Sequence, residues 1–276
     1  GRSLAERLNA QLGQAIVVEN RAGASGNLGT EYVAKSAPDG QTLLIAFDGT
    51  MVINPHVYTK LGFDPVRDFA PITKLGNSTQ ILVAHPSVPA NSLAELIGKA
   101  KTLPGLSYGT SGTASPGHVS GEMLRQMTSL DLTHVPYKGG GQAVTDVVGG
   151  QIPMIFTAVA TALPHIRNGR LKGLGVTAAT RSAQLPEVPT FVEAGLRDFV
   201  VDTWIGVVAP AKTPPATIER LHRAIVTIIA LPDVRDRYGA LGVEPIGNTP
   251  EEFAQQIASD FARWEKVVRR AGIRLD

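Results

Sequence analysis

The sequence has no cysteine and comparatively few charged residues. Without cysteine the chain can form no disulfide, no thiolate metal site and no cysteine nucleophile, and its redox compartment is left open. Lysine and arginine number 26 against 24 for aspartate and glutamate, and the positive residues form no basic run. The chain therefore lacks the electrostatic features of a protein that binds nucleic acid or an anionic membrane surface.

Long apolar runs are also absent. A bilayer-spanning helix needs about 18 apolar residues, whereas the run at 225–231 is interrupted by Thr227 and closed by Pro232. The first residues continue directly into an amphipathic pattern, which is not the pattern of a signal peptide. We therefore expect no transmembrane segment, and we expect a processed or trimmed chain.

What the sequence does contain is an alternation of short apolar runs and helical patterns. The apolar runs predict strands at 15–18, 42–47, 81–85, 106–109, 132–137, 152–156, 171–177 and 204–209. Helical spacing and capping residues predict a helix at 4–12 and another from the glycine-rich loop at 21–26 to residue 36. Further helices are predicted at 92–101, 115–127, 141–148, 160–167, 214–230, 232–241 and 249–271. This alternation is typical of parallel sheets with crossover helices.

The chain is long for one doubly wound sheet, so the pattern predicts two α/β domains. The run from about 103 to 177 has enough units for a sheet of its own, whereas the tail after 209 is almost entirely helical. Such a tail must pack on an existing sheet. The predicted domains are therefore a discontinuous first domain, 1–102 with 210–276, and a second domain, 103–209.

Two segments are rich in glycine, and the first lies where a dinucleotide fingerprint would be expected. Residues 23–29 read G-x-x-G-x-x-G, not the G-x-G-x-x-G of a dinucleotide site, and no acidic ribose partner follows at the end of a next strand. Backbone amides there can face an anion or simply shape a tight turn. At 137–142, glycines permit close backbone approach, and Lys138 is either a solvated surface residue or a ligand contact.

The loop at 109–118 is the richest in hydroxyl groups. It is not a nucleophile elbow, because Thr113 stands where glycine is required, and it lacks the Gly-Lys-Ser/Thr ending of a phosphate loop. Hydroxyls and free amides at a helix N-terminus suit a carboxylate. A second interpretation has equal weight: Ser115 only caps the helix, and the other residues form an ordinary loop.

No catalytic or metal-binding constellation is apparent. The six histidines form no i, i+4 pair and no HExxH motif. Asp48 and Asp202 follow predicted strands or loops, but sequence spacing identifies no Ser, Cys or His partner for either. We expect no metal, no cofactor and no catalysis.

Three separated segments carry a resemblance to a known family. They are VVENRAGASGNLG at 17–29 with APDG at 37–40, HVPYKGG at 134–140, and LPEVPT at 185–190 with EAG at 193–195. The chain resembles the Bug family, the TctC-like solute-binding receptors of tripartite tricarboxylate transporters, from Arg2 to the C-terminus.

The resemblance implies a type II periplasmic-binding-protein fold, with two doubly wound sheets and a ligand cleft between them. It further implies a periplasmic monomer that delivers a small carboxylate to membrane transporter subunits. Carried over position by position, the implied ligand-binding residues are Phe47, Asp48, Ser111, Gly112, Thr113, Thr157 and Ala158, with Lys138, Gly139 and Asp202 as weaker candidates.

Two departures from the family pattern shape the expectations. Thr157 stands where the family often has an aspartate, so we expect a plain organic acid to bind better than an amino acid. The family's first strand is absent before the first helix, so we expect a strand to precede Gly1 in the natural protein. The competing interpretations are a nucleotide-using α/β enzyme and the effector-sensing domain of a regulator, although the sequence shows no helix-turn-helix.

Overall fold

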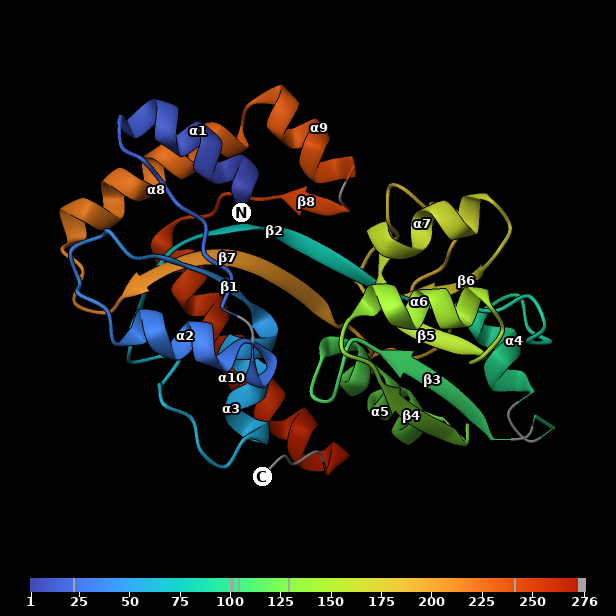
Figure 1. Ribbon diagram of the computed structural model, residues 1–276. Helices are drawn as coiled ribbons and strands as arrows, with labels where there is room; N and C mark the ends of the chain where they lie inside the picture. Colours follow the sequence, from blue (N-terminus) through green and yellow to red (C-terminus); the bar gives the residue numbers. More distant parts are fainter. Residues whose placement is uncertain (22, 100–101, 104, 129, 241, 273–276) are drawn as a thin grey trace. The chain divides into compact units, whose positions relative to one another are not determined.

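The computed structural model describes residues 1–21, 23–99, 102–103, 105–128, 130–240 and 242–272. They form two compact units: unit 1 contains Gly1–Asn77 and Trp204–Asp276, and unit 2 contains Ser78–Thr203 (Figure 1). The first unit is discontinuous in sequence. Its boundaries fall earlier than the predicted 102/103 and 209/210, because the second half of one long strand pairs with strands of unit 2.

Unit 1 is built on a sheet with the strand order β1-β7-β2, and β8 also pairs with β2. Its strands are β1 (Leu44–Phe47), β7 (Asp202–Pro210), the first half of β2 (Phe69–Ala84) and β8 (Val243–Pro245). β1 runs antiparallel to β7. The helices of unit 1 are α1 (Arg2–Leu12), α2 (Asn27–Ala34), α3 (Asn54–Val57), α8 (Pro215–Ile229), α9 (Pro232–Ala240) and α10 (Pro250–Ala271), with a 3₁₀ turn at Ala24–Gly26 and a π-helical turn at Gly49–Ile53.

The C-terminal helices pack on unit 1, which confirms the expectation for the helical tail. Leu4 and Leu8 of α1 belong to one apolar core with Leu221 and Ile225 of α8 and Val207 of β7. Figure 1 shows α1 and α8 side by side in this unit. The apolar face that α8 cannot bury alone is therefore covered by a helix from the other end of the sequence.

Several predicted strands of unit 1 differ from the structure. Residues 15–18 form no strand, and the stretch at 48–73, expected to be irregular, contains the π-helical turn, α3 and the start of β2. β2 has 16 residues instead of the five predicted at 81–85. Gly76 interrupts the apolar pattern of β2, which is why the sequence predicts only its last part. A β-carbon at Gly76 would lie 2.3 Å from the Glu244 backbone oxygen, so β8 can pair closely with β2 only because this residue has no side chain.

Unit 2 contains a five-stranded sheet with the order β6-β2-β5-β3-β4. Its further strands are β3 (Leu106–Thr110), β4 (Leu132–Pro136), β5 (Met154–Ala158) and β6 (Lys172–Val176), and its helices are α4 (Leu93–Gly98), α5 (Pro116–Met127), α6 (Gly140–Val148) and α7 (Val159–Arg167). β3 is parallel to β4 and β5, whereas β2 is antiparallel to β5 and β6. The sheet is therefore mixed, because β2 runs opposite to both of its neighbours in unit 2.

The predicted helices are largely confirmed, because capping is a local signal. Gly13 ends α1 with a φ of 64°, Ser115 accepts a hydrogen bond at the start of α5, and Thr249 forms a capping box with Glu252. The predicted helix ends at 101 and 241 lie outside the described residues. Within the described ranges, no helix is both long enough and apolar enough to cross a bilayer.

The capping box of α10 yields a stability prediction. Thr249 Oγ1 accepts from the Glu252 amide at 3.2 Å, so Thr249→Ala leaves that amide without its acceptor. We expect a loss of about 1 kcal/mol in the free energy of unfolding, measured by chemical denaturation. The matched control is Thr227→Ala, at an exposed position in the last turn of α8, where alanine is the better helix former. Equal losses for the two variants would contradict the capping role.

Candidate functional site

Three adjacent strands of unit 2 end at one edge of the sheet, and each is followed by a helix. β3, in the middle, is parallel to β4 and β5, so the carboxyl ends of all three lie on the same side. The helices that follow are α5, α6 and α7. Helix N-termini carry partial positive charge and unpaired amides. This edge therefore brings three such termini together.

The loops between these strands and helices are in close contact. A β-carbon placed on Gly140 would lie 3.3 Å from Thr157 Oγ1, and one placed on Gly112 would lie 3.4 Å from the Tyr137 oxygen. We call the three segments 110–115, 137–140 and 157–158 the strand-end site. Glycine at these positions leaves backbone amides accessible at short range.

The first turns of the three helices are capped differently. Ser115 Oγ accepts from the His118 amide at 3.3 Å at the start of α5. Gly139 and Ala158, the residues that precede α6 and α7, have no side-chain oxygen to act as a cap. Thr157 is buried, and its hydroxyl lies beside the first turn of α6. Donors for an anion are thus concentrated where α6 and α7 begin.

The hydroxyl-rich loop is held by internal hydrogen bonds to two histidines. Thr110 Oγ1 contacts the Gly112 amide at 3.2 Å and the Gly112 oxygen at 3.0 Å, and it lies 2.7 Å from His134 Nε2. The Ala114 amide donates to His118 Nδ1 at 3.1 Å. Burial lowers the pKa of both imidazoles, that of His134 to about 4. Both rings are therefore neutral at neutral pH.

Seven of the implied ligand-binding residues belong to the strand-end site: Ser111, Gly112, Thr113, Lys138, Gly139, Thr157 and Ala158. Ser111 and Lys138 are exposed, whereas Thr157 is 5% exposed. Asp202 is the first residue of β7, and its side chain lies outside the described part of the structure. The seven residues of the strand-end site therefore lie together at one edge of the sheet.

Phe47 and Asp48 lie in unit 1, where β1 ends and the π-helical turn begins. Phe47 is 38% exposed, and its ring covers Gly49 so closely that a β-carbon there would lie 2.3 Å from the ring. Asp48 is 2% exposed, and its Oδ2 has no hydrogen-bond partner within the described residues. Burial raises the pKa of Asp48 to about 8, against the opposing effect of the Gly49 amide. Asp48 is therefore largely protonated at neutral pH.

The glycine segment at 23–29 forms a tight turn anchored to α3. Gly23, Ala24, Ser25 and Gly26 all have positive φ angles, of 132°, 44°, 53° and 92°. Asn54 Nδ2 donates to the Ser25 oxygen at 3.3 Å. Because 15–18 form no strand, the segment also lacks the strand-loop-helix context that a dinucleotide fingerprint requires.

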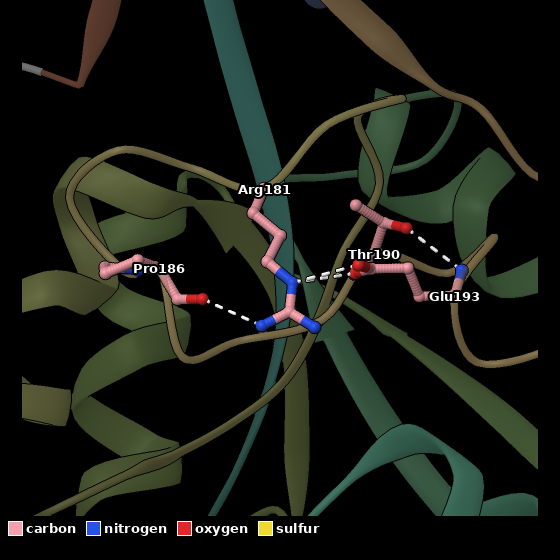
Figure 2. A network of polar contacts seen from close by, with 4 residues as sticks. All are labelled: Arg181, Pro186, Thr190 and Glu193. Carbon is pink, nitrogen blue, oxygen red and sulfur yellow. Dashed lines mark hydrogen bonds and ion pairs between the residues drawn. The ribbon is translucent and has the colours of Figure 1, made fainter.

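The third motif of the resemblance builds a folded loop of unit 2 (Figure 2). Arg181 Nε donates to Glu193 Oε2 at 2.9 Å, and Arg181 Nη1 donates to the Pro186 oxygen at 2.9 Å. Glu193 Oε2 also accepts from the Thr190 amide, and the Glu193 amide donates to Thr190 Oγ1. The Arg181 hydrogen bond, followed by that of Thr190, lowers the pKa of Glu193. This motif therefore shapes the loop that follows β6.

Sequence reasoning missed the pairing of His118 with His134. The two rings are stacked, with centroids 3.8 Å apart and an interplanar angle of 14°. His134 opens the HVPYKGG motif and His118 closes the hydroxyl-rich loop, but no spacing rule pairs them, and they meet only because α5 packs against β4. Across the described residues, no group of three His, Asp or Glu side chains is arranged to hold a metal ion.

Comparison with known proteins gives matches along the whole chain. The model of the tripartite tricarboxylate transporter family receptor, TctC, matches residues 1–273. Protein BugT of Bordetella pertussis is 34% identical over 276 residues, covering 99% of this chain and 85% of BugT. The structure of R. palustris Rpa4515 with adipate has a TM-score of 0.91 and 34% identity, covering 99% of this chain and 92% of that one. MatC of Rhodopseudomonas palustris with bound malate has a TM-score of 0.86 and 32% identity, covering 97% and 92%.

The buried carboxyl group of Asp48 predicts a pH-dependent stability. Its pKa is about 8 in the folded chain, above the ordinary aspartate value of 3.8, so the folded state holds an extra proton between these pH values. The stability of the wild type should therefore fall as the pH rises from about 4 to about 8. Asp48→Asn cannot ionise, and we expect its advantage over the wild type to grow by on the order of 4 kcal/mol between pH 5 and pH 8.5, because about three pH units of this range lie below the folded pKa.

Urea denaturation at the two pH values measures this difference. The matched control is Asp236→Asn, an exposed position on α9 of the same unit, which should follow the wild type at both pH values. If the advantage of Asp48→Asn did not change with pH, the buried carboxyl group would not be protonated at neutral pH.

Proposed function

The chain belongs to the TctC family, the receptors of tripartite tricarboxylate transporters, and from this premise we propose that it is a periplasmic solute-binding protein. It captures a small organic carboxylate and delivers it, as a monomer, to the membrane subunits of such a transporter. The observation that carries this proposal is the convergence of three helix N-termini at the strand-end site.

Backbone groups suit this task because a carboxylate needs several donors aimed at two oxygens. The first amides of α6 and α7 have no side-chain cap, and the Thr157 hydroxyl lies beside them. Hydrogen bonds from these groups, together with the helix dipoles, balance the charge of the ligand without a buried arginine or lysine. Lys138, which is exposed in the second loop, adds a positive charge at the solvent side.

The class of ligand follows from the relatives and from Thr157. Rpa4515 and MatC were solved with adipate and malate, which are small organic acids with two carboxyl groups. An amino acid would also bring an ammonium group, which needs a buried acceptor of opposite charge. Thr157 is neutral, so we propose that this chain selects a plain carboxylate over an amino acid.

One pair in the site has the residue types of a nucleophile and its base. Thr110 Oγ1 lies 2.7 Å from His134 Nε2, the distance expected for such a pair. Thr110 is fully buried, however, and its hydroxyl is engaged with Gly112. A His134 pKa of about 4 also makes the imidazole a weak base at neutral pH. We infer that the pair supports the loop and that the ligand is bound without being converted.

A thermal-shift panel tests the proposed function. A ligand at about 100 times its dissociation constant stabilises a protein by roughly 2.7 kcal/mol, which gives a visible rise in Tm. We expect such a rise with at least one acid among succinate, glutarate, malate, adipate and citrate, and none with ATP or NAD. A shift with a nucleotide and with none of the acids would overturn the proposal.

The same panel contains matched pairs for selectivity. Aspartate and glutamate differ from succinate and glutarate by one ammonium group, so their shifts isolate its effect. We expect larger shifts for the plain acids, and a larger shift for either amino acid would contradict the role assigned to Thr157.

The Thr157 hydroxyl gives a sharper prediction at one residue. Thr157→Val keeps the shape of the side chain and suits strand β5, but it removes the donor. We expect calorimetry to show a loss of about tenfold in affinity for the bound acid with little change in Tm, because hydrogen bonds to charged groups contribute roughly 1.5–3 kcal/mol. The control is Thr145→Val on α6, where the exposed hydroxyl donates to the Gly141 oxygen. Equal affinities for Thr157→Val and the wild type would exclude Thr157 from the site.

A further inference from the structure

Beneath the strand-end site lies a stacked pair of imidazoles. His118 is in the first turn of α5 and is 8% exposed, and His134 is in β4. Their nearly parallel rings are 3.8 Å apart. Stacking at this distance is favourable for neutral rings and unfavourable if both are charged, because like charges repel strongly away from water.

Each imidazole holds one end of the hydroxyl-rich loop. His118 Nδ1 accepts the hydrogen of the Ala114 amide at 3.1 Å. Ala114 has a φ of 62°, a left-handed conformation that costs a residue other than glycine about 1–3 kcal/mol, so this bond stabilises a strained position. At the other end, Thr110 Oγ1 donates to the Gly112 oxygen at 3.0 Å, so in the contact with His134 the hydrogen comes from Nε2.

The hydrogen bonds require a particular protonation state. Because His118 Nδ1 accepts, it must be unprotonated, which makes the neutral Nε2–H form the one that holds the loop. Glu122, also on α5, faces His118, but its charge is paired with Arg125 at 2.8 Å, and it accepts from the Tyr108 hydroxyl at 3.2 Å. The N-terminal turn of α5 further disfavours a positive charge.

We propose that His118 and His134 are positioning residues for ligand binding: as a neutral stacked pair, they hold the loop 111–115 in the shape that accepts the carboxylate. The inference rests on the proposed function and adds the control of that site by protons. Neither imidazole needs to touch the ligand.

Proton uptake then opposes ligand binding. A proton on His118 Nδ1 replaces an acceptor with a donor that faces the Ala114 amide. The loop in its bound shape keeps the pKa of His134 near 4 and that of His118 below its usual value, whereas displacement of the loop relieves both. Since the displaced form binds protons more readily, acid favours it. Affinity should be constant above about pH 6.5, the ordinary value for histidine, and should fall as the pH drops toward 4.

Two substitutions at His118 separate the hydrogen bond from the titration. His118→Asn places an amide oxygen near the position of Nδ1 and keeps the acceptor, but it does not titrate. His118→Leu removes the acceptor at every pH. His85→Asn is the matched control, because His85 is in the same unit and its Nδ1 bonds to the nearby Ser87.

Calorimetric titration with adipate and with malate measures the effect from pH 7.5 to pH 5. At pH 7.5 we expect His118→Asn to bind within about threefold of the wild type and His118→Leu to bind about tenfold more weakly. Toward pH 5 the Kd of the wild type should rise relative to that of His118→Asn by about tenfold. This ratio cancels the protonation of the acid itself, and His85→Asn should show no such trend.

Nitrogen-detected NMR of the ligand-free protein gives a readout that a purely structural role would not produce. We expect Nδ1 of His118 to be unprotonated at pH 7.5 and to take up a proton between about pH 6.5 and pH 5, the range over which the affinity falls. A protonated His118 at pH 6.5, equal binding by His118→Leu, or a flat ratio of wild type to His118→Asn would each overturn the inference. If His118→Leu does not fold, the ratio of the wild-type Kd to that of His118→Asn and the NMR signal of His118 still test the inference. Failure of the wild type to bind either acid at pH 7.5 would instead count against the proposed function and the inference together.

Discussion

The parallel pairing of β3 with both β4 and β5 is the constraint on which the candidate site depends. Parallel neighbours must be joined by crossover helices, so each strand delivers its chain to the same edge of the sheet and a helix begins there. The N-termini of α5, α6 and α7 are therefore gathered by topology. The partial positive charge at this edge of the sheet is therefore a property of the backbone.

Burial keeps titratable groups near the strand ends in their uncharged forms. In unit 2, the stacked imidazoles of His118 and His134 are neutral because a buried charge would be poorly solvated and would repel its neighbour. In unit 1, Asp48 holds its proton for the first of these reasons. Keeping these groups uncharged limits the free-energy cost of burying them. The two units therefore respond to pH in opposite directions, because Asp48 loses its proton as the pH rises, whereas the histidines gain protons as the pH falls.

The hydrogen bonds around the hydroxyl-rich loop join the end of β3 to the uncharged, buried histidines. Ala114 adopts a left-handed conformation that few residues other than glycine tolerate, and its amide is satisfied by an imidazole from the helix that follows. Strain of this kind persists only where the surroundings fix it, and it is frequent at ligand sites. The loop is therefore shaped by the residues behind it as much as by its own glycines and hydroxyls.

The sequence by itself determined the order and type of most elements, the discontinuous two-domain arrangement and the loops that form the strand-end site. These features follow from local signals: helical spacing around Leu4 and Leu8, the caps at Ser115 and Thr249, and glycines at strand ends act over a few residues. Tertiary structure alone decided the length and direction of β2, whose pattern is interrupted at Gly76, and the presence of β8 beside it. It also decided the neutral state of Asp48 and the stacking of His118 on His134, because burial and contact between residues distant in the chain cannot be read from the spacing of either one.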